Sequence, residues 1–124
     1  MIFAKRLFLI AGIYGLIVLV PQFFMETRTG QDYPPAITHP EFYYGFVSVS
    51  VAWQVLFLIL AKDPQRYRPM MIAAILEKAG FGIAVPVLYL QHRVSAFMLI
   101  FSTVDLILGA LFAVAYMKTR APTD

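Results

Sequence analysis

Four runs of about twenty mainly apolar residues constrain this chain more than any other feature of its sequence. They cover about residues 7–25, 42–61, 69–90 and 94–117. A helix needs about 20 apolar residues to cross ~30 Å of hydrocarbon, whereas a membrane barrel strand needs about 10 in alternation. Because hydrophobic residues make up 60% of the chain and charged residues 14%, lipid must cover part of the apolar surface. The sequence predicts an all-α membrane protein, a four-transmembrane-helix bundle in a single domain of residues 1–124.

The basic residues outside the middle of the runs predict how the helices are oriented. Arg28 and Arg93 lie on one side of the runs, and seven basic residues lie on the other. These seven are Lys5, Arg6, Lys62, Arg66, Arg68, Lys118 and Arg120. Cytoplasmic segments carry an excess of Lys and Arg. We therefore predict that both termini are cytoplasmic and that residues 26–41 form an outer loop. We also predict a multi-pass protein, located in a bacterial inner membrane.

Three charged residues interrupt the apolar runs near their middle. Glu77 and Lys78 lie in the third run and Asp105 in the fourth, ~12 to 18 Å from the inner ends at ~1.5 Å per residue. An unpaired charge at the bilayer centre costs ~2.5–3.5 kcal/mol on insertion scales, so we expect Lys78 to pair with Asp105. Trp53 and Gln54 of the second run share this depth, and we expect Glu77 to point towards them. These five residues form the predicted ligand-binding or ion-pair cluster.

Glycines near the charges and in the first run predict close helix packing. Small residues allow helix backbones to approach one another in lipid. We predict that five glycines lie at helix contacts. They are Gly12, Gly15, Gly80, Gly82 and Gly109.

The sequence carries no pattern of a metal, cofactor or nucleic-acid site. The chain has no cysteine, and its two histidines lack ligand spacing. The basic residues lie at the ends of apolar runs and form no patch interleaved with exposed polar groups. We predict no metal, no cofactor and no nucleic-acid partner, and we assign no catalytic residue.

Three functions remain open. The first is binding or transport of a small lipophilic or cationic molecule, in which Glu77 and Asp105 supply charge and Lys78 balances them. The second is a structural accessory subunit of a larger membrane complex, because buried ion pairs can also fix helix register. The third is a lipid-modifying, isomerase-like enzyme with Glu77 as acid and Asp105 as base; without a third group to orient them, we expect a role other than catalysis. The predicted partners are the lipid bilayer, such a ligand, and a second copy or a larger membrane complex.

The stretch "HPEFYYGFVSVSVAWQVLFLILAKDPQRYRPMMIAAILEK", residues 39–78, resembles small bacterial four-transmembrane-helix proteins of unassigned function. It covers about a third of the chain. The resemblance implies a four-span membrane protein and no particular chemistry.

Overall fold

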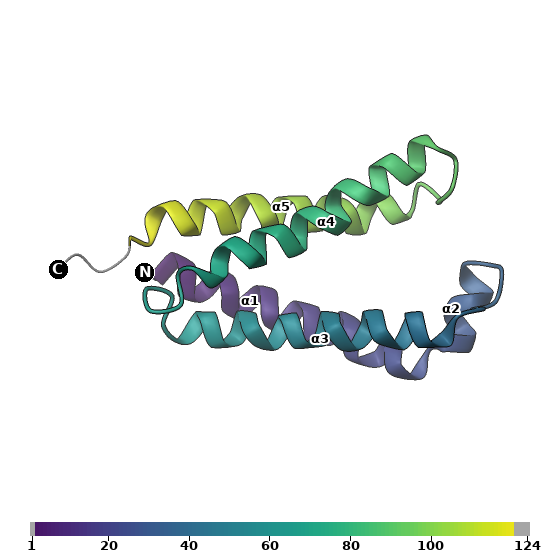
Figure 1. The fold of residues 1–124 in the computed structure, drawn as a ribbon, viewed down its shortest axis with the longest axis horizontal. Helices are drawn as coiled ribbons and strands as arrows, with labels where there is room; N and C mark the ends of the chain where they lie inside the picture. The colour runs from purple at the N-terminus through teal and green to yellow at the C-terminus, as the bar shows by residue number, and fades with distance from the viewer. Residues whose placement is uncertain (1, 121–124) are drawn as a thin grey trace.

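The computed structural model describes residues 2–120, and the described chain is built from helices (Figure 1). They are α1 (Ile2–Leu19), the 3-10 helix η1 (Val20–Phe24), α2 (Glu26–Asp32), α3 (Pro40–Lys62), α4 (Met70–Leu90) and α5 (Met98–Lys118). With α1 and η1 taken together, the described chain has four helices long and apolar enough to cross a membrane. The predicted all-α membrane protein with four transmembrane helices is confirmed.

The first helix begins earlier than its apolar run and changes type before it ends. α1 starts at Ile2 rather than near residue 7, so Lys5 and Arg6 lie in its first turns. Long basic side chains at a helix end can extend to the lipid headgroups while their stems stay against apolar surface. Pro21 lacks a backbone N–H and cannot donate the next α-helical hydrogen bond, and the chain continues here as the 3-10 helix η1. The outer loop also contains the short helix α2, which the apolar runs do not predict.

The last helix begins later than its apolar run because α4 ends in a structured turn. His92 has a left-handed conformation with φ of 59°. Its amide donates to the carbonyl of Tyr89, and the amide of Arg93 donates to the carbonyl of Leu88, both at 2.9 Å. This is the Schellman arrangement, with His at the position that Gly usually fills. α5 therefore begins at Met98 rather than near residue 94.

The four long helices form two pairs rather than an evenly packed bundle (Figure 1). α1 packs along α3 and α4 packs along α5, while the two pairs contact each other at few positions. The start of α1, the connection from α3 to α4 and the end of α5 lie at one end of the molecule, which we call the basic end. The opposite end, near α2, we call the α2 end.

Glycines create the close contacts within each pair. A Cβ added to Gly12 of α1 would lie 2.9 Å from the backbone oxygen of Gln54 on α3. A Cβ added to Gly82 of α4 would lie 2.8 Å from Leu106 Cγ on α5. Both distances are too short for a real Cβ, so these helices approach as they do because the positions are glycine. Each pair is therefore a tightly packed helical hairpin.

The two pairs are joined in the basic half by an aromatic core. Phe8 of α1, Phe57 of α3 and Phe112 of α5 are fully buried. The ring centroids of Phe8 and Phe112 lie 4.4 Å apart, and those of Phe57 and Phe112 lie 5.1 Å apart. At the basic end itself, Lys118 Nζ of α5 lies 4.9 Å from the ring centroid of Phe3 in α1. These contacts hold three helices from both pairs together.

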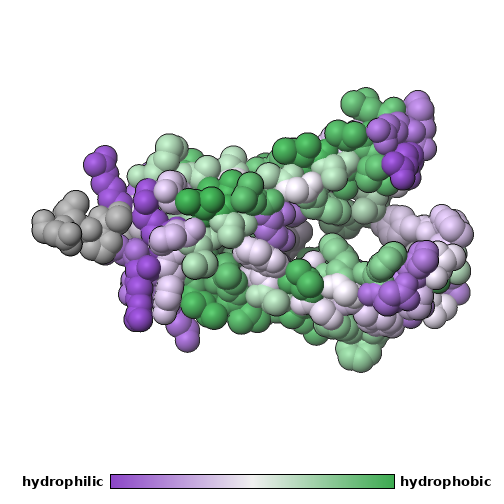
Figure 2. All heavy atoms as spheres, viewed as in Figure 1, coloured by the Kyte–Doolittle hydropathy of each residue, from purple (hydrophilic) through white to green (hydrophobic). Residues whose placement is uncertain are grey.

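Towards the α2 end the two pairs diverge. The space-filling view shows an opening between them in this half of the molecule (Figure 2). At its far end, Tyr33 after α2 stacks on Phe97 before α5, with ring centroids 6.4 Å apart. The opening therefore lies between the aromatic core on one side and the Tyr33–Phe97 contact on the other.

Candidate functional site

The charged residues in the middle of α4 and α5 form one ion-pair cluster. Lys78 Nζ lies 3.6 Å from Asp105 Oδ1 and 3.6 Å from Glu77 Oε2. The Lys78 side chain is 7% exposed, and each of the two acidic side chains is 19% exposed. The expected contact between Lys78 and Asp105 across the α4–α5 hairpin is present. Glu77 lies against the same amine on its own helix, and no hydrogen bond of residues 2–120 joins it to Trp53 or Gln54, towards which the sequence predicts that it points.

Gly109 makes room for Lys78 on the surface of α5. A Cβ at Gly109 would lie 3.3 Å from the Cβ of Lys78, so a larger residue there would crowd the lysine stem. Asp105 lies one helical turn before Gly109 on the same face of α5. The lysine therefore crosses α5 at a glycine and reaches the carboxylate one turn away.

Lys78 also lies at the boundary between the two helix pairs. Its Nζ is 5.3 Å from the ring centroid of Phe57, which belongs to α3 of the other pair. A lysine ammonium over an aromatic face is attracted by the ring quadrupole. Since Glu77 and Asp105 both reach this amine, the whole cluster lies at the interface of the pairs.

The sequence did not predict a role for Phe57. The sequence feature that could have revealed this role is the spacing of Trp53 and Phe57, which are four residues apart and so share a helix face. Trp53 is partly buried, and its ring centroid lies 6.4 Å from that of Phe57. Phe57 therefore contacts the charged cluster through Lys78, and Trp53 packs against Phe57.

Gln54 belongs to the contact between α1 and α3. Its side chain is buried and lies directly over Gly15, and its Nε2 donates to the carbonyl of Ser50 at 2.9 Å. Its Oε1 is buried and has no hydrogen-bond partner in the described chain.

Four of the five predicted packing glycines lie at helix contacts. Gly12 and Gly15 pack in the first pair, and Gly82 and Gly109 pack in the second. Gly80 differs from these four, because a Cβ there would meet nothing within 4 Å.

The ion pairs of the cluster are long, which leaves hydrogen-bonding capacity unused. A charge-assisted N–H···O bond is about 2.7–2.9 Å long, so 3.6 Å is an ionic contact rather than a tight hydrogen bond. Glu77 Oε2 is buried and has no hydrogen-bond partner in residues 2–120. A carboxylate has about four acceptor positions, and an ammonium has three donors. The cluster can therefore accept a further polar or charged group.

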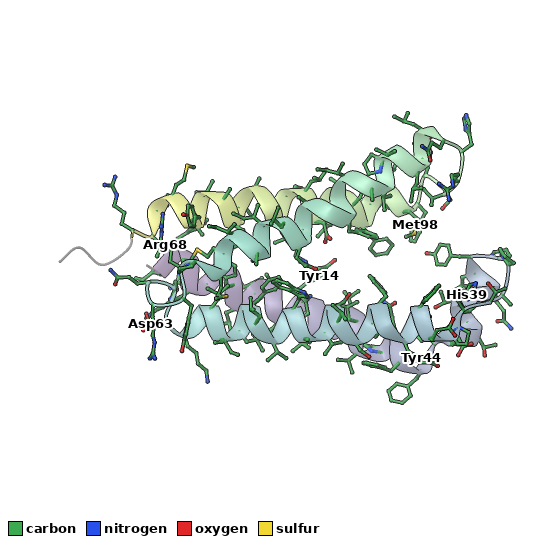
Figure 3. The ribbon with its side chains drawn as sticks, viewed as in Figure 1. Tyr14, His39, Tyr44, Asp63, Arg68 and Met98 are labelled. Carbon is green, nitrogen blue, oxygen red and sulfur yellow. The ribbon has the colours of Figure 1, made fainter. Side chains whose placement is uncertain are left out.

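The cluster lies beside the opening between the pairs. Away from their ends, the four long helices carry four strongly hydrophilic residues, Gln54, Glu77, Lys78 and Asp105. Figure 2 shows hydrophilic atoms at mid-length next to the opening. Figure 3 places Tyr14 of α1 in the interval between the pairs, and its side chain is 38% exposed. The cluster thus combines two acids and one base, and in this view Tyr14 lies in the same interval between the pairs.

Comparison with protein family models, with curated proteins and with solved structures finds no match for this chain. The similarity of residues 39–78 to small bacterial four-transmembrane-helix proteins stays a prediction.

Proposed function

We propose that this integral membrane protein binds a small lipophilic or cationic molecule in the opening between its two helix pairs. The observation that carries the proposal is the cluster of Glu77, Lys78 and Asp105 beside this opening. Two of its three charged side chains keep an exposed edge. Ionisable residues within membrane helices usually mark a path or a site for ions or substrates.

The charge of the cluster favours a cation. One ammonium and two carboxylates have a formal sum of −1 when all are ionised. Lys78 is the most buried of the three, and it occupies the side that faces Phe57. A bound cation would contact the exposed edges of Glu77 and Asp105 and restore neutrality at the cluster. Tyr14 would supply an aromatic surface, and cations bind favourably over such rings.

Binding is a simpler proposal than transport. The aromatic core of Phe8, Phe57 and Phe112 fills the basic half of the interface. A molecule that crossed the membrane through the bundle would require the two pairs to separate at this core. A dimer could instead provide a path between two copies.

The test is the identity of the molecules that co-purify with the protein in mild detergent. Native mass spectrometry of the wild-type chain should show a small bound molecule, and the Glu77→Gln variant should lose it while circular dichroism stays unchanged. Glu41→Gln is the matched control, because Glu41 is exposed and pairs with His39 at the start of α3, outside the charged cluster. If Glu77→Gln retains the molecule to the same extent as Glu41→Gln, binding at the cluster is ruled out.

An accessory subunit is the second candidate, and the divergence of the helix pairs favours it. A transmembrane helix of a partner protein could enter the opening and place a basic residue beside Glu77 and Asp105. Size-exclusion chromatography of the same variants separates the two candidates. A subunit role requires that Glu77→Gln loses a larger assembly, whereas a ligand role requires that it loses only the small molecule. No structural observation favours the isomerase-like enzyme, which stays a prediction.

A further inference from the structure

A shallow groove at the basic end lies between α1 and α3, away from the charged cluster. Its volume is about 480 Å³. It is lined by Lys5, Arg6 and Leu9 of α1 and by Leu58, Ala61 and Lys62 of α3. Three cations thus surround a groove whose remaining lining is aliphatic.

The basic side chains of this groove have no acidic partner in the described chain. No carboxylate of residues 2–120 forms an ion pair with Lys5, Arg6 or Lys62. Asp63 follows Lys62 directly, but its Oδ1 accepts a hydrogen bond from the backbone amide of Arg66. The three positive charges are therefore available to an external anion.

Other basic residues at the same end are engaged within the protein. The guanidinium of Arg68 donates two hydrogen bonds, of 3.0 and 3.1 Å, to the carbonyl oxygen of Tyr116 and stacks on its ring. Lys118 lies over Phe3 of α1. The groove residues differ from these, because two helices bring them together without using their charges.

We propose that this groove binds the headgroup of an anionic phospholipid. The phosphate would lie among Lys5, Arg6 and Lys62, and the first part of an acyl chain would lie on Leu9 and Leu58. Leu9 is four residues deeper in its helix than Lys5, and Leu58 is four residues deeper than Lys62, or ~6 Å in each case. The charged and aliphatic parts of the groove therefore follow the order of a phospholipid from headgroup to tail. A free phosphate ion would leave the aliphatic lining unused.

The test uses dioleoyl phosphatidylglycerol and dioleoyl phosphatidylcholine as probes, added to delipidated full-length protein in neutral detergent. Native mass spectrometry measures the bound fraction of each lipid. The protein should retain phosphatidylglycerol in preference to phosphatidylcholine. The combined variant Lys5→Gln/Arg6→Gln/Lys62→Gln should lower phosphatidylglycerol retention at least about tenfold, since each basic residue at a membrane surface adds to the attraction of anionic lipid.

The matched control is Arg66→Gln/Lys118→Gln/Arg120→Gln, which removes three positive charges from the same end but none from the groove. It should retain phosphatidylglycerol within about twofold of the wild type, because none of its positions lines the groove. If the control loses as much lipid as the groove variant, net charge rather than the groove explains retention. Equal retention of phosphatidylcholine, or full displacement of the lipid by inorganic phosphate, would also overturn the proposal. Circular dichroism of both variants confirms that each is folded.

Discussion

Lys78 of α4 lies at the same distance from two carboxylates, 3.6 Å from Asp105 of α5 and 3.6 Å from Glu77 of its own helix. A single amine thus balances charge on two helices at the middle of the bundle. Without it, two carboxylates would face each other in a weakly polar interior. The stability of the α4–α5 hairpin should therefore depend more on Lys78 than on either acid.

This asymmetry predicts different effects of Lys78→Met and Glu77→Gln on stability. Loss of one partner from a buried ion pair typically costs about 3–5 kcal/mol, because the remaining charge is left without compensation. Lys78→Met should lower the free energy of unfolding by about this amount. Glu77→Gln should lower it much less, since Lys78 and Asp105 remain as a neutral pair. Unfolding by dodecyl sulfate titration, followed by circular dichroism, measures both. Equal losses in the two variants would contradict the central position of Lys78.

The packing of α1 on α3 predicts that Gly12 cannot be replaced by alanine without cost. A Cβ at Gly12 would lie 2.9 Å from the backbone oxygen of Gln54, which cannot rotate away. Gly12→Ala should destabilise the protein by about 1–3 kcal/mol, as overpacking of a tight contact does. Gly80→Ala is the control, because its Cβ would meet nothing within 4 Å. The same unfolding titration compares them, and a loss in Gly80→Ala as large as in Gly12→Ala would argue against the helix pairs described above.

The aromatic core predicts that phenylalanines at the basic half and at the α2 end respond differently to truncation. Phe112 is fully buried among Phe8 and Phe57, whereas Phe42 of α3 is 69% exposed. Phe112→Ala should destabilise the protein, though less than the about 3–5 kcal/mol seen in soluble cores. Association of helices in lipid gains packing but little hydrophobic transfer energy. Phe42→Ala should have little effect, and a larger loss from Phe42→Ala than from Phe112→Ala would exclude the aromatic core as the joint between the pairs.

The predicted orientation can be tested directly because the chain has no cysteine. Single cysteines at Gln65, between α3 and α4, and at Gln31 of α2 are both at exposed positions. In intact bacterial cells, a membrane-impermeant maleimide should label Gln31→Cys and should label Gln65→Cys only after the membrane is permeabilised. This pattern follows from the seven basic residues at the basic end. The reverse pattern would place both termini outside.

The apolar runs were sufficient to predict four membrane helices, because length and hydropathy alone decide whether a helix can span a bilayer. The contact of Lys78 with Asp105 was also predictable, since buried charges at one depth must find partners. The sequence did not show that α1 pairs with α3 and α4 with α5. That arrangement depends on close contacts such as Gly12 against Gln54, which spacing does not identify.

The position of Gln54 illustrates the same limit. Depth predicted that Gln54 would lie with Glu77, but depth does not specify which face of α3 carries it. In the structure this face packs on Gly15 of α1, whereas Phe57 points to the cluster. Likewise, Gly80 was a predicted packing residue because it lies near the charged residues, yet it faces open space. Helical periodicity defines stripes of residues, and only tertiary packing decides which stripe meets which helix.

Binding of a lipophilic cation tests the proposed site most directly. Isothermal titration of purified protein with tetrapropylammonium and with tetraphenylphosphonium measures affinity for a smaller and a larger probe. At least one of the two cations should bind the wild type. Asp105→Asn should raise the dissociation constant of that cation about tenfold or more, which corresponds to a loss of at least ~1.4 kcal/mol of binding free energy. Asp63→Asn is the matched control, since Asp63 lies in the α3–α4 connection at the basic end and caps a turn there. The account predicts that only Asp105→Asn loses affinity; no binding of either cation, or equal affinity in both variants, would contradict it.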